Sequence, residues 1–351
     1  MKITTTLLAL FWVLLIGAQT TDLKYDRIPL TKGAEVIKGL ALSPDGNEIA
    51  ISTFAGKLRF FDAESYTETR MFKIGDFNHG ARIHYSASGK YIILKRLRLA
   101  DWNVNKDNKL LIGIIDVQSG ELVVKKDGIY DLDLSPTEDT YSYMDGGKLV
   151  VCSFPDGKEI ASLSDPRLQS SISYGPEGKI VYASRGFDKK DLKKDPRFKK
   201  DRKGKKSFSK FQQTIVGYKA TDLSQSFITG ENFDEIYDIM LSDKKDRLLI
   251  SAKQDMRVNA MISTFFILQM ELGTGRLLRE QFNSTLADAD FKENISKNLI
   301  GVTTNEHMDS SHSVMLYDVS TTEIMARFDV DTRWLESLQM DGGQDGSAHF
   351  D

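Results

Sequence analysis

A single cysteine, Cys152, stands in this chain of 351 residues. One thiol cannot form an intrachain disulfide, and the sequence holds no paired-cysteine motif for a metal or a redox reaction. Cys152 ends the apolar run 149–152, a context that predicts a buried and unreactive thiol. The fold must therefore be stabilised by its core rather than by covalent cross-links.

Histidine is also scarce, with five in the chain. His307 and His312 are close in sequence, but their spacing is not that of two zinc ligands on a helix. The Gly-x-Ser-x-Gly turn of serine hydrolases and the glycine-rich phosphate loop are absent from the sequence. These absences leave no recognised catalytic motif, and we expect no cofactor and no dedicated metal.

Long hydrophobic runs are confined to the first residues. Lys2 precedes an apolar stretch over 7–16, and the small residues Gly17 and Ala18 follow it. This pattern predicts a secretory signal peptide over 1–18, so we expect an exported protein, periplasmic or secreted. No second run of about twenty apolar residues follows, which predicts no membrane span after cleavage.

Charge is nearly balanced overall, at −3, but it is unevenly distributed. The segment 189–210 holds twelve Lys or Arg and three Asp, a local excess of nine positive charges. It lies in a basic insertion over 185–213 that is interleaved with phenylalanines. One interpretation is a binding surface for an anionic partner. The other is a solvated loop whose like charges repel one another and keep it disordered. We expect no nucleic acid as a partner because the protein is predicted to be exported.

What the sequence has in abundance is a repeated turn phrase between two short apolar runs. Each copy reads as strand, tight turn, strand. The copies are 42–46, 85–89, 134–138, 174–178 and 241–245. Runs rich in β-branched and aromatic residues follow each copy, which predicts four antiparallel strands per unit.

Some third strands end in an aromatic-acid pair, as at Phe61-Asp62 and Tyr317-Asp318. With the Ser-Pro-Asp-Gly turn at 43–46, these pairs resemble the WD-repeat and related bacterial β-propeller families. The third and fourth units depart from this ending, and His79-Gly80 reverses the Gly-His order of the WD signature. The resemblance implies an all-β propeller of four-stranded antiparallel blades, forming one domain over 23–351, and we expect a monomer.

Six complete blades are expected. They begin near Gly39, Arg82, Asp131, Ser171, Asp238 and Asp288. Further strands over 335–340 and 347–350, together with 24–31, predict a seventh blade shared between the two ends of the chain. Such sharing removes exposed sheet edges. Six blades with a free tail is the alternative.

The connections between second and third strands are expanded in four units. They are 95–109, 185–213, 253–263 and 305–313. Alternating strand direction brings these connections to one face, where binding residues on a rigid scaffold tend to lie. Chance insertion into tolerant loops is the alternative. Our candidate ligand-binding residues there are Trp102, Lys199, Lys200, Arg202 and Lys203.

A second candidate site follows from the repeat register. The alignment places Asp131, Asp238 and Asp288 at the start of the innermost strand, with Arg82 and Ser171 at the same level. Such positions would face the mouth of a central channel, and three carboxylates could hold a divalent cation or a cationic ligand. The alternative is that each Asp caps a local turn.

The sequence therefore predicts a non-catalytic exported binding or scaffold module that engages a protein or an anionic polymer. The alternative is a hydrolase resembling the propeller lactonases, in which the three channel acids hold a metal that activates water.

Overall fold

The computed structural model describes residues 37–78, 80–97, 109–186, 213–229, 233, 235–242, 245–255, 263–272, 274–283, 286–294, 299–306, 312–318 and 324–330. These residues form six four-stranded sheets. In every sheet the strands follow one another in chain order, and each pairs antiparallel with the next.

The first three sheets have the following strands. The first contains β1 (Ile37–Leu42), β2 (Glu48–Thr53), β3 (Lys57–Asp62) and β4 (Glu68–Lys73). The second contains β5 (Arg82–Tyr85), β6 (Tyr91–Leu97), β7 (Leu110–Asp116) and β8 (Leu122–Ile129). The third contains β9 (Asp131–Leu134), β10 (Thr140–Asp145), β11 (Lys148–Ser153) and β12 (Glu159–Ser164).

The other three sheets repeat the plan. The fourth contains β13 (Leu168–Tyr174), β14 (Ile180–Gly186), β15 (Gln213–Lys219) and β16 (Gln225–Ile228). The fifth contains β17 (Glu235–Leu241), β18 (Arg247–Asp255), β19 (Ser263–Glu271) and β20 (Leu277–Asn283). The sixth contains β21 (Leu286–Asn294), β22 (Leu299–Glu306), β23 (His312–Asp318) and β24 (Ile324–Val330).

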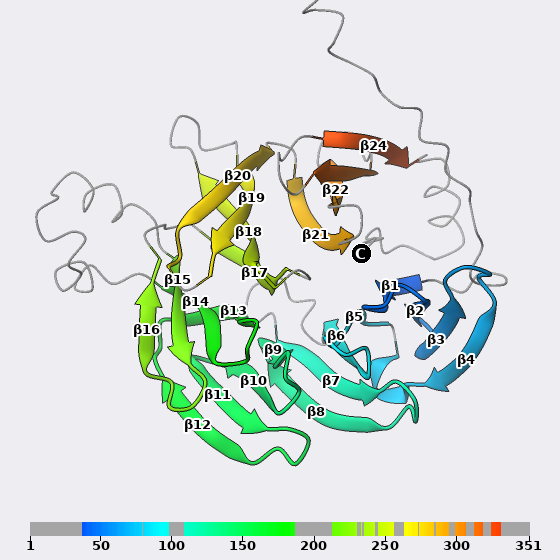
Figure 1. Ribbon diagram of the computed structural model, residues 1–351, viewed down its shortest axis with the longest axis horizontal. Coiled ribbons are helices and arrows are strands. Elements are labelled where there is room, and N and C mark those ends of the chain that lie inside the picture. Colours follow the sequence, from blue (N-terminus) through cyan, green and yellow to red (C-terminus); the bar gives the residue numbers. More distant parts are fainter. Residues whose placement is uncertain are drawn as a thin grey trace, which may run out of the picture.

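The sheets are arranged like blades around a common centre, with the first strand of each sheet innermost (Figure 1). This is the all-β, blade-like propeller architecture that the repeat predicts. The six predicted blade starts each fall within an inner strand. The predicted signal peptide 1–18 and the strands predicted over 24–31, 335–340 and 347–350 lie outside the described residues.

The repeated phrase forms the turn between the first and second strands. In the first sheet the Ser43 N–H donates to Glu48 O, and the Glu48 N–H donates to Ser43 Oγ. Gly46 has a positive φ of 78°, which glycine adopts without a steric penalty. Glu138 and Lys245 hold the same place with φ of 56°, so the turn survives without glycine.

The acid at the end of a third strand also has a local structural role. Asp62 Oδ1 accepts the N–H groups of Glu64 and Ser65, and Asp116 Oδ1 accepts those of Gln118 and Ser119. Each carboxylate thereby satisfies the turn that leads into the fourth strand. The aromatic-acid pair Phe61-Asp62 thus has a structural role in the fold.

The core lies between successive sheets. Phe60 of the first sheet packs in one cluster with Ile83 and Leu94 of the second. Cys152 is buried in the next cluster, and burial raises the pKa of its thiol. The predicted burial of this cysteine is confirmed.

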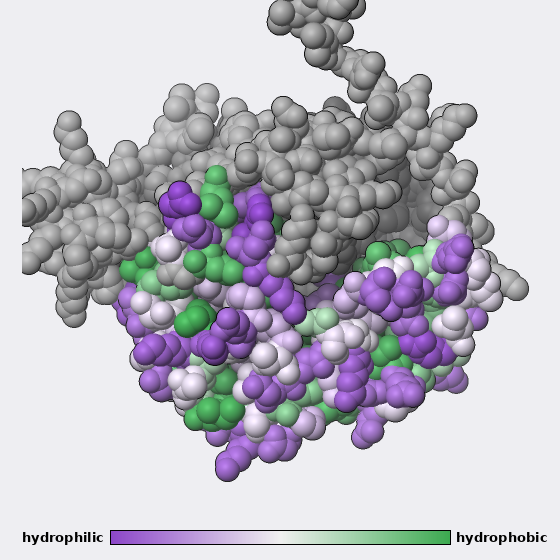
Figure 2. All heavy atoms as spheres, in the orientation of Figure 1, coloured by the Kyte–Doolittle hydropathy of each residue, from purple (hydrophilic) through white to green (hydrophobic). Residues whose placement is uncertain are grey.

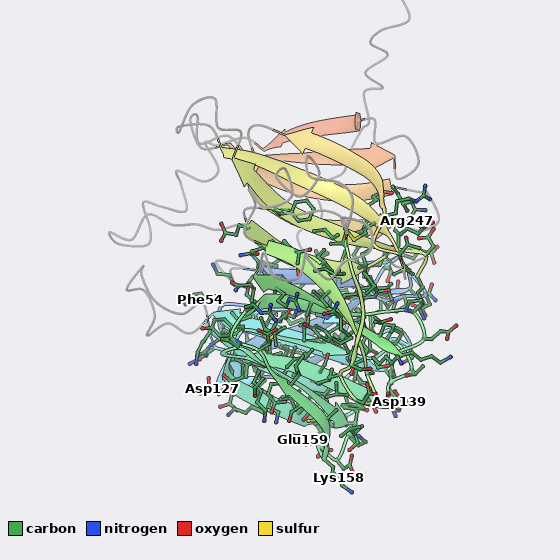
Figure 3. All side chains as sticks on the ribbon, turned by 90° about the vertical axis from the view of Figure 1, so that its left-hand side faces the viewer. Phe54, Asp127, Asp139, Lys158, Glu159 and Arg247 are labelled. Carbon is green, nitrogen blue, oxygen red and sulfur yellow. The ribbon has the colours of Figure 1, made fainter. Side chains whose placement is uncertain are left out.

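The two faces of the blade arrangement differ in their connections. On one face, the turns between first and second strands and between third and fourth strands each span five residues, as 43–47 and 154–158 do. Only the turn over 295–298 is shorter. On the other face, second-to-third connections range from 146–147 to 187–212. Figure 3 shows Phe54 and Asp127 on one side of the sheets and Asp139 and Arg247 on the other.

We call the side with the variable connections the loop face and the opposite side the turn face. Of the residues labelled in Figure 3, Phe54 lies in a second-to-third connection and Asp139 lies in a first-to-second turn. Among the described residues, no helix is long and apolar enough to cross a membrane.

Candidate functional site

The register of the inner strands defines one equivalent position in each sheet. At this position an inner-strand residue pairs with a second-strand residue thirteen places later. The pairs are Gly39 with Ser52, Arg82 with Lys95, Asp131 with Met144, Asp238 with Ser251, and Asp290 with Thr303. Ser171 holds this position in the fourth sheet, where its N–H donates to Ser184 Oγ. Arg82, Asp131, Ser171 and Asp238 therefore share the level that the sequence assigns to them.

The sixth sheet differs from the expectation. Asp290, not Asp288, holds the equivalent position, because it is the residue that pairs with Thr303. Asp288 lies where the register shifts, between Leu286 and Ala289. Counted back from the end of the hairpin, Asp290 lies four residues before Asn294, as Asp131 lies four residues before Ser135, so the expected alignment is displaced by two residues. The predicted alignment of Asp288 with Asp131 and Asp238 is wrong.

Asp131 links three consecutive sheets. Its Oδ1 lies 2.6 Å from Lys95 Nζ of the second sheet and accepts the Leu132 N–H of its own strand. Its Oδ2 accepts the Ile172 N–H of the fourth sheet at 3.0 Å. This buried carboxylate therefore joins the second, third and fourth sheets through its contacts.

Asp133, two residues further along β9, repeats the contact. Its Oδ1 accepts the Leu134 N–H, and its Oδ2 accepts the Tyr174 N–H of the fourth sheet at 2.8 Å. Burial raises the pKa of this carboxyl to about 6, against the lowering effects of Lys95 and the two N–H donors. Both acids accept backbone N–H groups of their own strand and of the fourth sheet, and Asp131 in addition pairs with the Lys95 ammonium.

Lys95 supplies the positive charge of this cluster. Burial alone would lower the pKa of its amine, but the carboxylates of Asp131 and Asp238 together raise it above its usual range. An ammonium thus lies near Asp131 and Asp238, two of the three carboxylates to which the hydrolase hypothesis assigns a metal. Within the residues that the structure describes, no three His, Cys, Asp or Glu side chains come together as a metal site would require.

Asp238 also has a local partner, since its Oδ1 accepts the Ile239 N–H at 2.9 Å. In the same way, Asp131 Oδ1 accepts the N–H of the following residue, Leu132. The alternative that these acids cap the entry of the strand is therefore supported by geometry, and the geometry adds a pairing with Lys95.

The second candidate site lies on the loop face. Trp102, Lys199, Lys200, Arg202 and Lys203 fall outside the described residues. What the structure does describe is the base of the basic insertion. The Gly186 N–H donates to Arg167 O at one end, and Gln213 and Phe233 exchange backbone hydrogen bonds at the other.

The base of the insertion is further fixed by charge. Arg167 Nη2 lies 2.7 Å from Asp165 Oδ2, and the buried Arg185 lies 3.9 Å from the same oxygen. The guanidinium of Arg167 and its hydrogen bonds hold the pKa of Asp165 below its usual range. The insertion thus starts and ends on an ordered part of the fourth sheet. In the view of Figure 2, hydrophilic and hydrophobic residues are interspersed over the described surface.

Sequence reasoning missed Lys95 and Asp133. Lys95 was assigned to the expanded connection 95–109, although it lies thirteen residues after Arg82, the spacing that every other sheet repeats. Asp133 carried a usable signal, because it alternates with Asp131 and therefore points to the same side of the strand.

Neither a scan of known protein families nor a search of curated proteins finds a match to this chain. The class of the molecule thus rests on its own geometry, which is that of an all-β protein built of propeller-like blades.

Proposed function

We propose that this protein is an exported, non-catalytic binding module that engages a protein or an anionic polymer through its loop face. The observation that carries the proposal is the contrast between the two faces. Turns of nearly constant length occupy the turn face, whereas second-to-third connections on the loop face vary from 146–147 to 187–212.

A scaffold with a functional face explains this contrast. Sheets that pack on both neighbours leave little freedom to the strands, so variation is tolerated only in connections. Random insertion would be expected on both faces, since lengthening a surface loop costs little. The restriction of long connections to one face therefore favours the interpretation that this face contacts a partner.

Charge supports an anionic partner. The segment 189–210 carries nine net positive charges, while the whole chain carries −3, so the remainder is acidic. A basic segment on an otherwise acidic molecule attracts polyanions locally and does so less at high salt. Kinship with WD-repeat-like propellers is part of this proposal, supported by the Ser43–Gly46 turn phrase.

The test compares two sets of four neutralised charges. In one variant Lys199, Lys200, Arg202 and Lys203 are replaced by Gln. In the matched control the same change is made to four turn-face residues: Lys90, Lys158, Lys179 and Lys245.

We expect the loop variant to elute from a heparin-like resin at clearly lower salt than the wild type, with the control close to wild type. Equal shifts in both variants would mean that only net charge matters, and would overturn the anionic-partner proposal. Salt-insensitive capture of an exported protein, lost in a variant with 187–212 replaced by the 146–147 turn, would identify a protein partner instead.

A further inference from the structure

The guanidinium of Arg185 lies between the outer parts of the third and fourth sheets. Its Nη1 is 3.9 Å from Asp165 Oδ2, just after β12, and 3.4 Å from Gln225 Oε1, at the start of β16. The side chain of Arg185 is only 4% exposed. A positive charge is thus held inside the boundary between two blades.

The charges of this cluster do not balance. Arg167 pairs closely with Asp165, because its Nε and Nη2 lie 2.8 Å and 2.7 Å from the two carboxylate oxygens. Arg185 shares the same carboxylate at the longer distance of 3.9 Å. These two guanidiniums and one carboxylate leave one net positive charge, and an anion beside a buried charge stabilises it.

A buried hydroxyl belongs to the same cluster. Tyr218 of β15 is 3% exposed, and its hydroxyl has no hydrogen-bond partner among the residues that the structure describes. Burial raises the pKa of this phenol, and the nearby guanidinium of Arg185 acts on it in the opposite direction. Since a guanidinium only donates hydrogen bonds, the phenol proton has no acceptor there. A buried donor without an acceptor is unfavourable, so the position calls for one.

Gln225 provides access to the cluster from solvent. It is exposed on the outer strand β16, and its amide oxygen is the neutral acceptor that Arg185 contacts at 3.4 Å. This distance exceeds the roughly 2.7–2.9 Å of a hydrogen bond between charged groups. A carboxylate in place of the amide would gain a shorter and stronger bond. The exposed Gln225 side chain can turn aside into water without disturbing the core.

We propose that this boundary binds one carboxylate group of a small ligand, which displaces the Gln225 amide and accepts hydrogen bonds from Arg185 and from the Tyr218 hydroxyl. The two oxygens of a carboxylate suit two donors of different kinds. Its single negative charge matches the net charge of the cluster, whereas a phosphate group carries about two at neutral pH. The inference does not depend on the proposed function, because it involves neither the basic insertion nor a macromolecular partner.

Acetate is the probe for this site. The full chain is titrated with sodium acetate at constant ionic strength, and the backbone amide resonances of Tyr218 and Gln225 are followed by NMR. Chloride and phosphate are the comparison ions. We expect saturable shifts with acetate and none with chloride or phosphate. No saturable shift with acetate, or equal responses to acetate and phosphate, would overturn the proposal.

Two tyrosine variants test the hydroxyl. Tyr218→Phe should weaken acetate binding about tenfold, which corresponds to one lost hydrogen bond. Tyr174→Phe is the matched control, because Tyr174 is also buried and its hydroxyl also lacks a hydrogen-bond partner among the described residues. That hydroxyl lies near Ser142 rather than near a guanidinium, so acetate should bind this variant as it binds the wild type. Equal losses in both variants would contradict the assignment of Tyr218.

Gln225→Glu gives a measurement that needs no added ligand. Its carboxylate would take the place of the amide and occupy the site from within the chain. We expect a higher unfolding midpoint than that of the wild type and no response to acetate. Gln225→Ala, which removes the competing amide, should bind acetate at least as tightly as the wild type. Acetate binding that persists unchanged in Gln225→Glu would overturn the proposal, whether or not Tyr218→Phe folds.

Discussion

Asp133 Oδ2 accepts the N–H of Tyr174 across the boundary between the third and fourth sheets, at 2.8 Å. A side chain of one blade thus completes the backbone of the next. Ser173 repeats the contact toward Leu241 of the fifth sheet at 3.1 Å. These bonds fix the sheets relative to one another, in addition to the apolar clusters between them.

The first prediction concerns the pH dependence of stability. Burial raises the pKa of Asp133 from its usual value of 3.8 to about 6. Between these two values the native state holds a proton on Asp133 that the unfolded chain does not, so its contribution to stability falls as the pH rises from about 4 to 6. Urea unfolding at several pH values measures this slope.

The control for this slope is Asp133→Asn, which cannot titrate. The variant should be less stable by about 1–3 kcal/mol, because one amide cannot accept both N–H groups that the carboxylate accepts. The stability advantage of the wild type over this variant should shrink as the pH rises from 4 to 6. An advantage that is constant over this range would contradict the raised pKa.

The second prediction concerns Lys95. Replacing it with Met leaves the buried carboxylate of Asp131 without its cation, and we expect a loss of roughly 2–4 kcal/mol in the free energy of unfolding. The double variant Lys95→Met/Asp131→Asn should recover part of the loss, since it removes the unpaired charge. Chemical denaturation of the wild type, Lys95→Met, Asp131→Asn and the double variant completes the double-mutant cycle.

A surface pair provides the comparison. Lys179 and Glu177 are also 2.6 Å apart, but both side chains are exposed. Lys179→Met should therefore change stability by less than about 1 kcal/mol. Equal losses in Lys95→Met and Lys179→Met would mean that burial does not strengthen the Lys95 pair.

The blades could be predicted from sequence because local chemistry determines them. The Ser43–Gly46 turn and its copies recur at a constant distance from the strands, and their hydrogen bonds are made within a few residues. The sheet boundaries carry no such local signal. The bond between Asp133 and Tyr174 joins residues far apart in sequence, and its partner is known only once the sheets are placed.

The same reason explains the error at Asp288. The sequence over 295–298 has no copy of the turn phrase that would fix the register of the sixth sheet. Lys95 was missed because the end of β6 merges into a polar stretch of sequence. Its role follows only from Asp131 of the next sheet.

The third prediction separates the binding module from the metal-dependent alternative. Because the Lys95 ammonium already compensates Asp131 and Asp238, we expect the thermal unfolding midpoint to be unchanged by Ca²⁺ or Zn²⁺ and by a chelator. Calorimetry with and without each reagent measures this. A midpoint raised by a metal in the wild type, but not in Asp238→Asn, would favour the hydrolase.

The last prediction tests how closely the inner strands approach their neighbours. A Cβ at Gly39 would overlap the carbonyl oxygen of Ala81, in the connection between the first and second sheets. That oxygen also accepts a hydrogen bond from Ser52 Oγ, so it cannot move without losing the bond. Gly39→Ala should therefore destabilise the protein by about 1–3 kcal/mol, as overpacking of a core does.

Gly75→Ala is the matched control, because a Cβ there meets no atom within 4 Å and the backbone needs no positive φ. It should leave the unfolding midpoint near that of the wild type or slightly raise it. Denaturation of both variants under one condition isolates the close approach at Gly39 from the general effect of adding a methyl group. If the two variants were equally stable, the first and second sheets would not be in the tight contact that the Ala81 carbonyl defines.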